Sequence, residues 1–227
     1  MFRDIPVHSG ILKAKGYYHG ECVAIDRITF PALPKPEDYA ESQAEEQIVS
    51  AETDLYRINC GGKEYRDVNG RVWAADLPLT ERAYGYRSWG SNYPDVEEEI
   101  GSVGRSFDLI MGTWEQLLAQ QFRYGRGKLI YCFPVKPGKY AIDMFFVEPW
   151  YGLANEDAVG WRLFDVAVND QIQIAQLDIF REAGGSCRLV KKQVLVSIET
   201  EMLKISFPNP RSNQALISAI RINAASE

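Results

Sequence analysis

Two adjacent aromatic residues, Trp150 and Tyr151, stand between Pro149 and Gly152, directly after a strand-like run. Aromatic rings on a loop can offer a flat apolar surface with a polar edge, and this chemistry suits the C–H face of a sugar ring. The alternative is that Trp150 caps the hydrophobic core and contacts no ligand. Because functional residues concentrate on loops, we expect the aromatic pair to form a binding surface.

The carboxyl groups of this chain do not indicate catalysis. Glycoside hydrolysis needs two carboxyl groups about 5–10 Å apart that flank the scissile bond. Glu148, Asp157 and Asp165 are present, but no motif pairs them. Histidine occurs only as His8 and His19, ahead of the main domain, so that domain has no Ser–His–Asp set. We therefore expect no catalytic centre in this chain.

The cysteines do not indicate a metal site. They stand at positions 22, 60, 132 and 187, without a CxxC spacing. A structural zinc site needs clustered Cys or His ligands, and both histidines lie outside the main domain. We expect no metal and no cofactor, and free, partly buried thiols, although the spacing leaves a disulfide open.

The net charge of −6 is concentrated in one stretch. Residues 37–54 carry seven acidic side chains and no Lys or Arg, so removing this −7 leaves +1 for the rest of the chain. A nearly neutral fold argues against nucleic acid and against an anionic membrane surface as partners. No apolar run reaches the roughly 18 residues of a membrane span, and MFRDIPVHSG lacks the apolar segment of a signal peptide.

Short strand-like runs follow one another through the second half of the chain, with turn signals every 8–12 residues or so, which is typical of an antiparallel β-sandwich. Asn169-Asp170 predicts a hairpin turn, Pro137-Gly138 predicts a type II turn, and residues 113–121 predict a helical turn or two. The alternation puts these residues on buried faces: Leu129, Tyr131, Phe133 and Val135; Tyr140, Ile142, Met144 and Phe146; and, in a strand predicted over 161–168, Phe164, Val166 and Val168.

Three segments make up the predicted organisation. Residues 1–34 hold two strand-like runs around His19-Gly20, and residues 35–54 form an acidic linker with some helical propensity. Residues 55–225 form the main all-β domain. Its irregular stretch 76–126 is long for a compact domain, and such loops are usually functional.

The main domain resembles a malectin domain over roughly residues 55–224. The resemblance implies a jelly-roll-like β-sandwich of the carbohydrate-binding type, with its ligand site on loops at one end. Its motifs occur in this order: INCGG (58–62), VWAAD (72–76), FRYG (122–125), FPVKPGKY (133–140), FVEPWYG (146–152), WRLFDVAVND (161–170), LDIFREAGG (177–185) and LISAIRI (216–222).

The first 34 residues resemble the last two strands of the Ig-like domain in family 2 glycoside hydrolases of the β-galactosidase type. In bacterial members of that family a malectin module often follows this domain, with elements similar to RSFD (105–108), FRYGR (122–126) and GWRLFDVAVN (160–169). The resemblance implies a C-terminal part of a secreted or periplasmic enzyme for polysaccharide degradation. Its catalytic domains would be partners in cis, and an oligosaccharide or polysaccharide would be the ligand.

The resemblance also implies candidate sugar-binding residues. Trp150 and Tyr151 match the aromatic pair that stacks on the sugar, and Tyr124 matches a ligand-contacting tyrosine. Malectin uses an Asp before the last strand, where this chain has no acid. The remaining candidates are Arg123, which either donates to hydroxyls or pairs with an acid; Tyr86 and Trp89, with Tyr84, on the long loop; and Asn213, which with Ser212 replaces the Asp.

Two functions remain open at this point. The first is a carbohydrate-binding module, which the aromatic pair and the long loop favour. The second is a structural or oligomerisation module of the same enzyme without sugar affinity, which the missing acid favours. The identity of the sugar does not follow from the fold.

Overall fold

The computed structural model describes residues 10–18, 21–30, 54–81, 83–89, 102–125, 128–154, 156–212 and 214–225, the first two ranges by their backbone alone. The chain divides into two units, Met1–Glu52 and Thr53–Glu227, which are considered separately. In the first unit, β1 (Gly10–Tyr18) and β2 (Glu21–Phe30) pair antiparallel from Gly10↔Phe30 to Tyr18↔Glu21. The predicted linker lies outside the described residues, except for Asp54.

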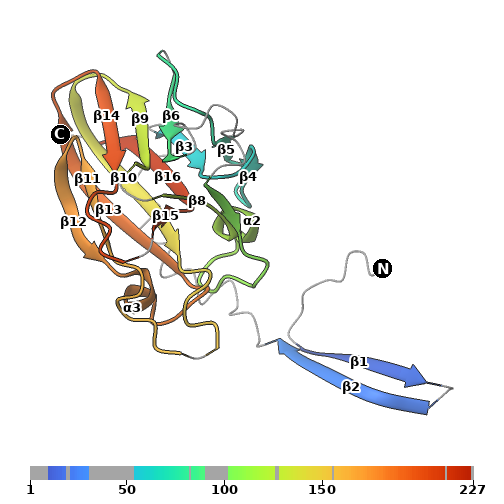
Figure 1. Ribbon diagram of the computed structural model, residues 1–227. Helices are drawn as coiled ribbons and strands as arrows, with labels where there is room; N and C mark the ends of the chain where they lie inside the picture. Colours follow the sequence, from blue (N-terminus) through green and yellow to red (C-terminus); the bar gives the residue numbers. More distant parts are fainter. Residues whose placement is uncertain are drawn as a thin grey trace. The chain divides into compact units, whose positions relative to one another are not determined.

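The second unit consists mainly of β-strands, drawn from cyan to red in Figure 1. Its elements are β3 (Asp54–Asn59), β4 (Tyr65–Arg66), β5 (Val72–Ala75), β6 (Gly85–Arg87), β7 (Val103–Arg105), α2 (Gln116–Gln120), β8 (Gln121–Gly125), β9 (Ile130–Pro134), β10 (Gly138–Val147), β11 (Phe164–Val168), β12 (Gln171–Leu177), α3 (Ile179–Ala183), β13 (Leu189–Ile198), β14 (Met202–Ser206), β15 (Ala215–Ile217) and β16 (Ala219–Ala224).

Two large sheets and one small sheet organise this unit. The larger sheets have the strand orders β13-β10-β16-β3-β5-β4 and β12-β11-β14-β9-β6, and the small sheet has the order β15-β8-β7. One hydrophobic cluster takes its buried residues from both large sheets, so their inner faces pack against each other as in a β-sandwich. The predicted all-β sandwich is confirmed.

The alternation of the strands explains this core. Tyr140, Ile142, Met144 and Phe146 of β10 are all buried in it, as the period of two predicts. The inward residues of β9 and β11 are buried in the same cluster, while Val135, beyond the end of β9, packs against it half-buried. The periodicity therefore identified the residues of β9, β10 and β11 that pack into this core.

The local predictions had mixed outcomes. Asn169 and Asp170 both have positive φ and connect β11 to β12, as a two-residue hairpin turn requires. The short helix α2 lies within the predicted 113–121 stretch. The type II turn was wrong, because Gly138 does not have positive φ and instead begins β10 opposite Ile198. No helix among the described residues has the length and apolar character needed to cross a membrane.

Candidate functional site

A row of aromatic side chains lies where β8, the segment after β10 and the segment before β11 come together. Trp150 is 43% exposed, and its ring meets Phe122 and Tyr124 edge to face at centroid distances of 5.1 and 5.9 Å. Half-buried Tyr151 meets Trp161 in the same manner at 5.6 Å, and Trp161 is 45% exposed. We call Tyr124, Trp150, Tyr151 and Trp161 the aromatic platform.

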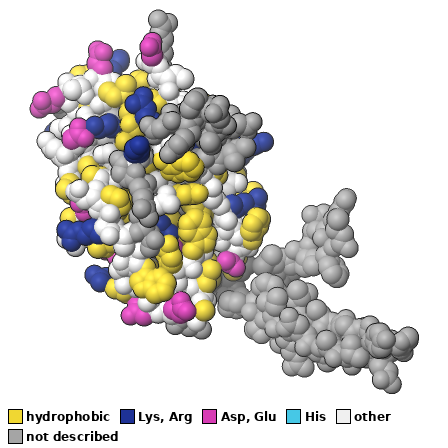
Figure 2. Space-filling model, in the orientation of Figure 1, with side chains coloured by type: hydrophobic (Ala, Val, Ile, Leu, Met, Phe, Trp, Pro, Cys, Tyr) yellow, Lys and Arg dark blue, Asp and Glu magenta, His cyan; other side chains and the backbone are white. Residues whose placement is uncertain are grey.

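Hydrophobic side chains also gather on the surface in this part of the domain. In Figure 2 they lie over β8 and β15 and continue toward the loops near α3. Isolated exposed hydrophobic residues are ordinary, whereas exposed apolar surface that gathers in one place is common at binding sites. The platform is therefore the candidate site of this domain.

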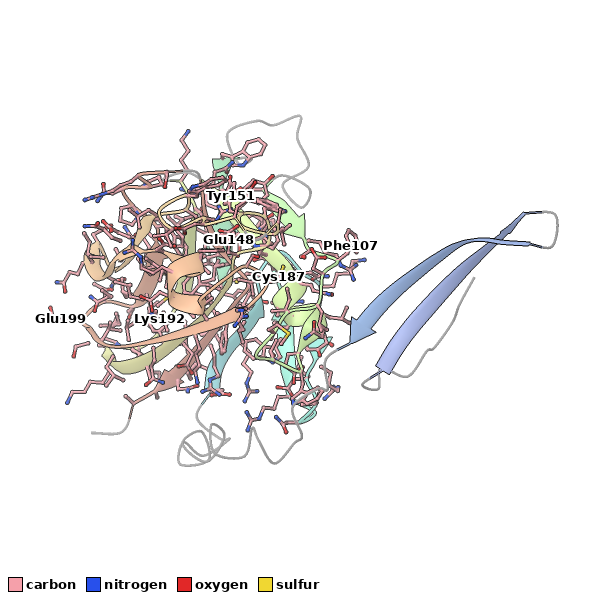
Figure 3. All side chains as sticks on the ribbon, turned by 90° about the horizontal axis from the view of Figure 1, so that it is seen from below. Phe107, Glu148, Tyr151, Cys187, Lys192 and Glu199 are labelled. Atoms are coloured by element: carbon pink, nitrogen blue, oxygen red, sulfur yellow. The ribbon has the colours of Figure 1, made fainter. Side chains whose placement is uncertain are left out.

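A buried carboxylate fixes the backbone of the Trp150-Tyr151 turn. Glu148 is fully buried, and its Oε1 accepts hydrogen bonds from the backbone N–H groups of Trp150 and Tyr151, both at 3.2 Å. Its Oε2 accepts from Nε of Arg162 at 2.6 Å, and the side chain of Arg162 is also buried. Figure 3 labels Glu148 and Tyr151 on the same side of the domain. These contacts hold the two aromatic residues in one backbone conformation.

Arg162 connects this turn to two further segments. Its guanidinium carbon lies 5.6 Å from the ring centroid of Trp150 and 5.0 Å from that of Tyr151, within cation–π range of both. Its Nη1 donates to the carbonyl oxygen of Gln214, just before β15. Because the negative charge of Glu148 neutralises the positive charge of Arg162, this buried pair adds no net charge beneath the aromatic rings.

The segment that carries Trp161 is braced as well. The N–H of Gly160 donates to Asp178 at 2.6 Å, and Asp178 also caps α3 by accepting from the N–H of Arg181. The hydroxyl of Ser212 donates to the carbonyl oxygen of Gly160 at 2.8 Å, and the N–H of Trp161 donates to Ala158 at 3.0 Å. Trp161 therefore projects from a turn that is hydrogen-bonded on several sides.

Glycine is required where the Trp150-Tyr151 turn closes. Gly152 has φ of +83°, and a Cβ added there would approach Cε2 of Phe180 on α3 to 2.3 Å. A side chain at this position would meet both backbone strain and a steric clash. The sequence EPWYG thus combines a bracing acid, two aromatic rings and the glycine that lets the turn pack on α3.

Arg123 and Tyr86 do not reach the surface, although both were predicted to contact sugar. Each is only 1% exposed. Arg123 donates from Nε to Oδ2 of Asp76 at 2.5 Å, and its guanidinium carbon lies 3.3 Å from the ring centroid of Tyr86. The alternative for Arg123, a pair with an acid, is what the structure contains. These two residues belong to the core and are removed from the set of contact candidates.

The Asp76 carboxylate is the centre of this buried network. It also accepts from the N–H of Gly61 at 2.6 Å and from the hydroxyl of Tyr131 at 3.2 Å. Burial raises the pKa of Asp76, and the guanidinium of Arg123 offsets only part of that effect. Burial likewise raises the pKa of Tyr131 and that of the Cys60 thiol. Cys60 of the INCGG motif and the Asp76 side chain of the VWAAD motif therefore belong to the interior of the fold.

The other predicted residues have different outcomes. Trp89 is half-buried and immediately precedes residues 90–101, which lie outside the described part of the chain, as does Asn213. Ser212 supports the turn at Gly160, as shown above, and Tyr84 is half-buried and packs against the core. Tyr124, Trp150 and Tyr151 are brought together, and their contact with sugar remains a prediction.

Sequence reasoning missed three residues of the site. Trp161 was assigned to a strand over 161–168, but the strand begins at Phe164 and leaves Trp161 on a turn. Glu148 was considered only as a catalytic acid, and Arg162 was not considered. The available signal was the spacing, since Glu148 precedes Trp150 by two residues and Arg162 follows Trp161 directly.

The carboxyl groups considered for catalysis have structural contacts. Glu148 pairs with Arg162 as described, and Asp157 accepts from the N–H of Val159 at 3.0 Å. Asp165 accepts from the N–H of Gln176 at 2.7 Å. Among the described residues, no group of three or more His, Cys, Asp or Glu side chains is placed to hold a metal ion.

Cys60, Cys132 and Cys187 are free and buried. The side chain of Cys22 lies outside the described part of the chain.

Comparison with known proteins extends these observations. Malectin-B of Xenopus laevis is 26% identical over 133 residues, which cover 58% of this chain and 41% of that protein. Mouse malectin is 28% identical over 137 residues, covering 60% and 40%. A probable LRR receptor-like serine/threonine-protein kinase of Arabidopsis thaliana is 25% identical over 187 residues, covering 74% and 20%. The chain thus matches about two fifths or less of the length of these relatives.

Solved structures share the fold at low sequence identity. Bacteroides uniformis β-glucuronidase 2 aligns with a TM-score of 0.62 and 18% identity, over 100% of this chain and 23% of that chain. The plant receptor-like kinase FER aligns with a TM-score of 0.59 and 16% identity, over 79% and 52%.

The family model described as the malectin domain matches residues 54–224, which is most of the chain and nearly the whole second unit. This domain is a non-catalytic module of the carbohydrate-binding type. The sequence match, the β-sandwich and the aromatic site at the strand ends agree, and the chain belongs to the malectin domain family.

Proposed function

We propose that this chain is a carbohydrate-binding module that holds a glycan on the aromatic platform and performs no catalysis itself. The observation that carries the proposal is the exposed ring of Trp150, held on a turn whose backbone is bonded to the buried Glu148–Arg162 pair. An aromatic ring that is already in place pays little ordering cost when a ligand binds. Its apolar face then complements the C–H face of a sugar ring.

The expected ligand is an oligosaccharide or polysaccharide that binds outside any catalytic centre. The buried pair is internally neutral, so it gives the platform no net charge with which to select an ionic group. Specificity must then come from ring shape and from hydroxyl contacts at the edges. The hydroxyl of Tyr151 and the indole N–H groups are suitable donors at those edges.

The finer proposal concerns the protein to which the module belongs. Residues 1–34 resemble the end of an Ig-like domain, and β1 and β2 form the expected antiparallel pair. A β-glucuronidase shares the fold along the whole chain, at an identity that supports the fold alone. We therefore infer a secreted or periplasmic bacterial glycoside hydrolase of family 2, of the β-galactosidase type. There the module would raise the effective concentration of substrate near the catalytic domains in cis.

A second candidate is a structural or oligomerisation module with no sugar affinity. A specific observation favours it: Phe107 is 84% exposed and stands in a segment with four further exposed large hydrophobic residues. Exposed apolar surface of this kind is typical of protein interfaces. The residues of this segment are Phe107, Leu109, Met111, Trp114 and Leu117.

The test is a titration of the chain with oligosaccharides, comparing Trp150→Ala with Phe107→Ala. Phe107 is labelled away from Tyr151 in Figure 3, so it serves as the control. We expect Trp150→Ala to lower affinity at least about tenfold, which corresponds to about 1.4 kcal/mol, and to keep the fold. Calorimetry and Trp fluorescence measure the binding. Unchanged affinity in Trp150→Ala would show that the aromatic platform is not the sugar-binding site. If the wild-type chain binds no sugar up to millimolar concentration but self-associates, and Phe107→Ala abolishes that self-association, the second candidate is established.

A further inference from the structure

The aromatic platform presents a second exposed tryptophan that the motif comparison did not identify. Trp161 is 45% exposed, slightly more than Trp150, and its ring contacts Tyr151, the residue that follows Trp150 in the sequence. A large hydrophobic side chain that stays at the surface forgoes the stabilisation that removal from water would give it. An exposed tryptophan on a braced turn is therefore a candidate for contact with a ligand.

Hydrogen bonds of the backbone fix the turn that carries Trp161. Its backbone is fixed by the bond of Gly160 to Asp178, by that of Ser212 to Gly160, and by the bond from Trp161 to Ala158. These bonds use backbone atoms and the side chains of other residues. The indole group, 45% exposed, therefore stands on a fixed turn, as the Trp150 ring stands on the turn that Glu148 braces.

The rings form two contacting pairs that both lie near Arg162. Tyr124 contacts Trp150 at 5.9 Å and Tyr151 contacts Trp161 at 5.6 Å, while the guanidinium carbon of Arg162 lies 5.6 Å from the Trp150 ring and 5.0 Å from the Tyr151 ring. One sugar ring stacks on one aromatic ring, so a row with an exposed indole at two places has more stacking surface than a monosaccharide can use. A ligand that covers the row must contain several linked sugar rings.

We propose that Trp161 forms a second sugar-stacking subsite, and that the ligand class is therefore an oligosaccharide chain of two or more units that extends from Trp150 across Tyr151 to Trp161. The inference rests on the proposed carbohydrate-binding function and deepens it. It assigns to Trp161 a role in selecting chain length. Trp150 supplies the stacking that a single sugar unit can use.

The experiment compares three variants of the full 227-residue chain. Trp161→Ala removes the ring, Trp161→Tyr keeps an aromatic face, and Val159→Ala removes an exposed apolar side chain from the same turn as a matched control. The probes are cello-, manno-, galacto- and malto-oligosaccharides of one, two and four units. Calorimetry gives the affinity of each variant for each chain length.

The wild-type chain should bind the four-unit probe of its preferred series more tightly than the monosaccharide. Trp161→Ala should lose roughly three- to tenfold of the affinity for that probe, the range that aromatic contacts give, and leave monosaccharide affinity unchanged. Trp161→Tyr should recover most of the loss, and Val159→Ala should match the wild type.

The possible failures are distinguishable. If the wild type binds sugar but its affinity does not rise with chain length, or if Trp161→Ala matches the wild type at every length, the second subsite is wrong and the proposed function stands. If the wild type binds no probe, the proposed function falls together with the subsite. Should Trp161→Ala fail to fold, indole N–H signals of the wild type decide: the Trp161 signal must shift with the four-unit probe and stay in place with the monosaccharide.

Discussion

Replacing Glu148 with glutamine should lower the unfolding free energy of the domain by about 3–5 kcal/mol, the usual cost of removing one partner from a buried ion pair. The side chains of Glu148 and Arg162 are 1% and 2% exposed, so water cannot replace the lost carboxylate. The amide oxygen of glutamine can still accept from the N–H groups of Trp150 and Tyr151. The decrease in unfolding free energy therefore reports mainly the unpaired buried charge of Arg162, because the hydrogen bonds to the turn backbone are kept.

An exposed ion pair of the same length provides the control. Nζ of Lys192 lies 2.6 Å from Oε2 of Glu182, the same separation as between Nε of Arg162 and Oε2 of Glu148. Both side chains of the control pair are partly exposed, at 28% and 45%. Lys192→Met should cost less than about 1 kcal/mol, because solvent screens such a pair. The two variants differ mainly in the burial of the charges.

The assay is urea unfolding followed by tryptophan fluorescence. With a slope of about 2 kcal/mol per M, the loss in Glu148→Gln lowers the midpoint by roughly 1.5–2.5 M. The double variant Glu148→Gln/Arg162→Met removes both charges and leaves neither unpaired. Its loss of unfolding free energy should therefore be smaller, by more than about 1 kcal/mol, than the summed losses of the single variants Glu148→Gln and Arg162→Met. Equal losses in Glu148→Gln and Lys192→Met would refute the reasoning, because the pair would then not behave as a buried one.

Two further predictions concern the interior. Gly61→Ala should lower the unfolding free energy, measured by urea unfolding, by about 2 kcal/mol or more. The reason is that Gly61 has φ of +77° and that a Cβ there would lie 2.5 Å from the carbonyl oxygen of Phe122. A loss below about 0.5 kcal/mol would contradict the tight turn. Burial raises the pKa of the three described thiols, so few of them are thiolates at pH 8. Iodoacetamide should therefore label these cysteines slowly in the native protein and quickly in denaturant, as followed by mass spectrometry. Rapid labelling of the native protein would contradict their burial. The thiols are Cys60, Cys132 and Cys187.

Local pattern was sufficient to predict the sandwich, because the information lies within each strand. In β10, four alternate residues from Tyr140 to Phe146 are apolar and buried, and a period of two requires no knowledge of the partner strands. The Asn169-Asp170 turn is likewise determined by the tolerance of these residues for positive φ. Gly138 differed because its pairing with Ile198, 60 positions along the sequence, requires extended backbone there.

The site was predicted only in part, since burial of a polar residue depends on distant partners. The partner of Arg123 is Asp76, 47 residues earlier, and no local spacing connects the two. Arg123, next to Tyr124, and Tyr86, on the long loop, were therefore taken for contact candidates, although both side chains are buried. Trp161 was missed for the opposite reason, because a strand assigned three residues too early placed it inside an element.

The positions of Glu148 and Arg162 connect the two proposed stacking positions and give Glu148 a positioning role in the site. Glu148 precedes Trp150 by two residues and Arg162 follows Trp161 directly, so one ion pair joins the two turns that display the indoles. A general acid must present an exchangeable proton to the scissile bond. Glu148 is fully buried, and both of its oxygens already accept hydrogen bonds from Arg162 or the turn backbone. Glu148, the acid of the site nearest to the two rings in sequence, is thus committed to positioning them.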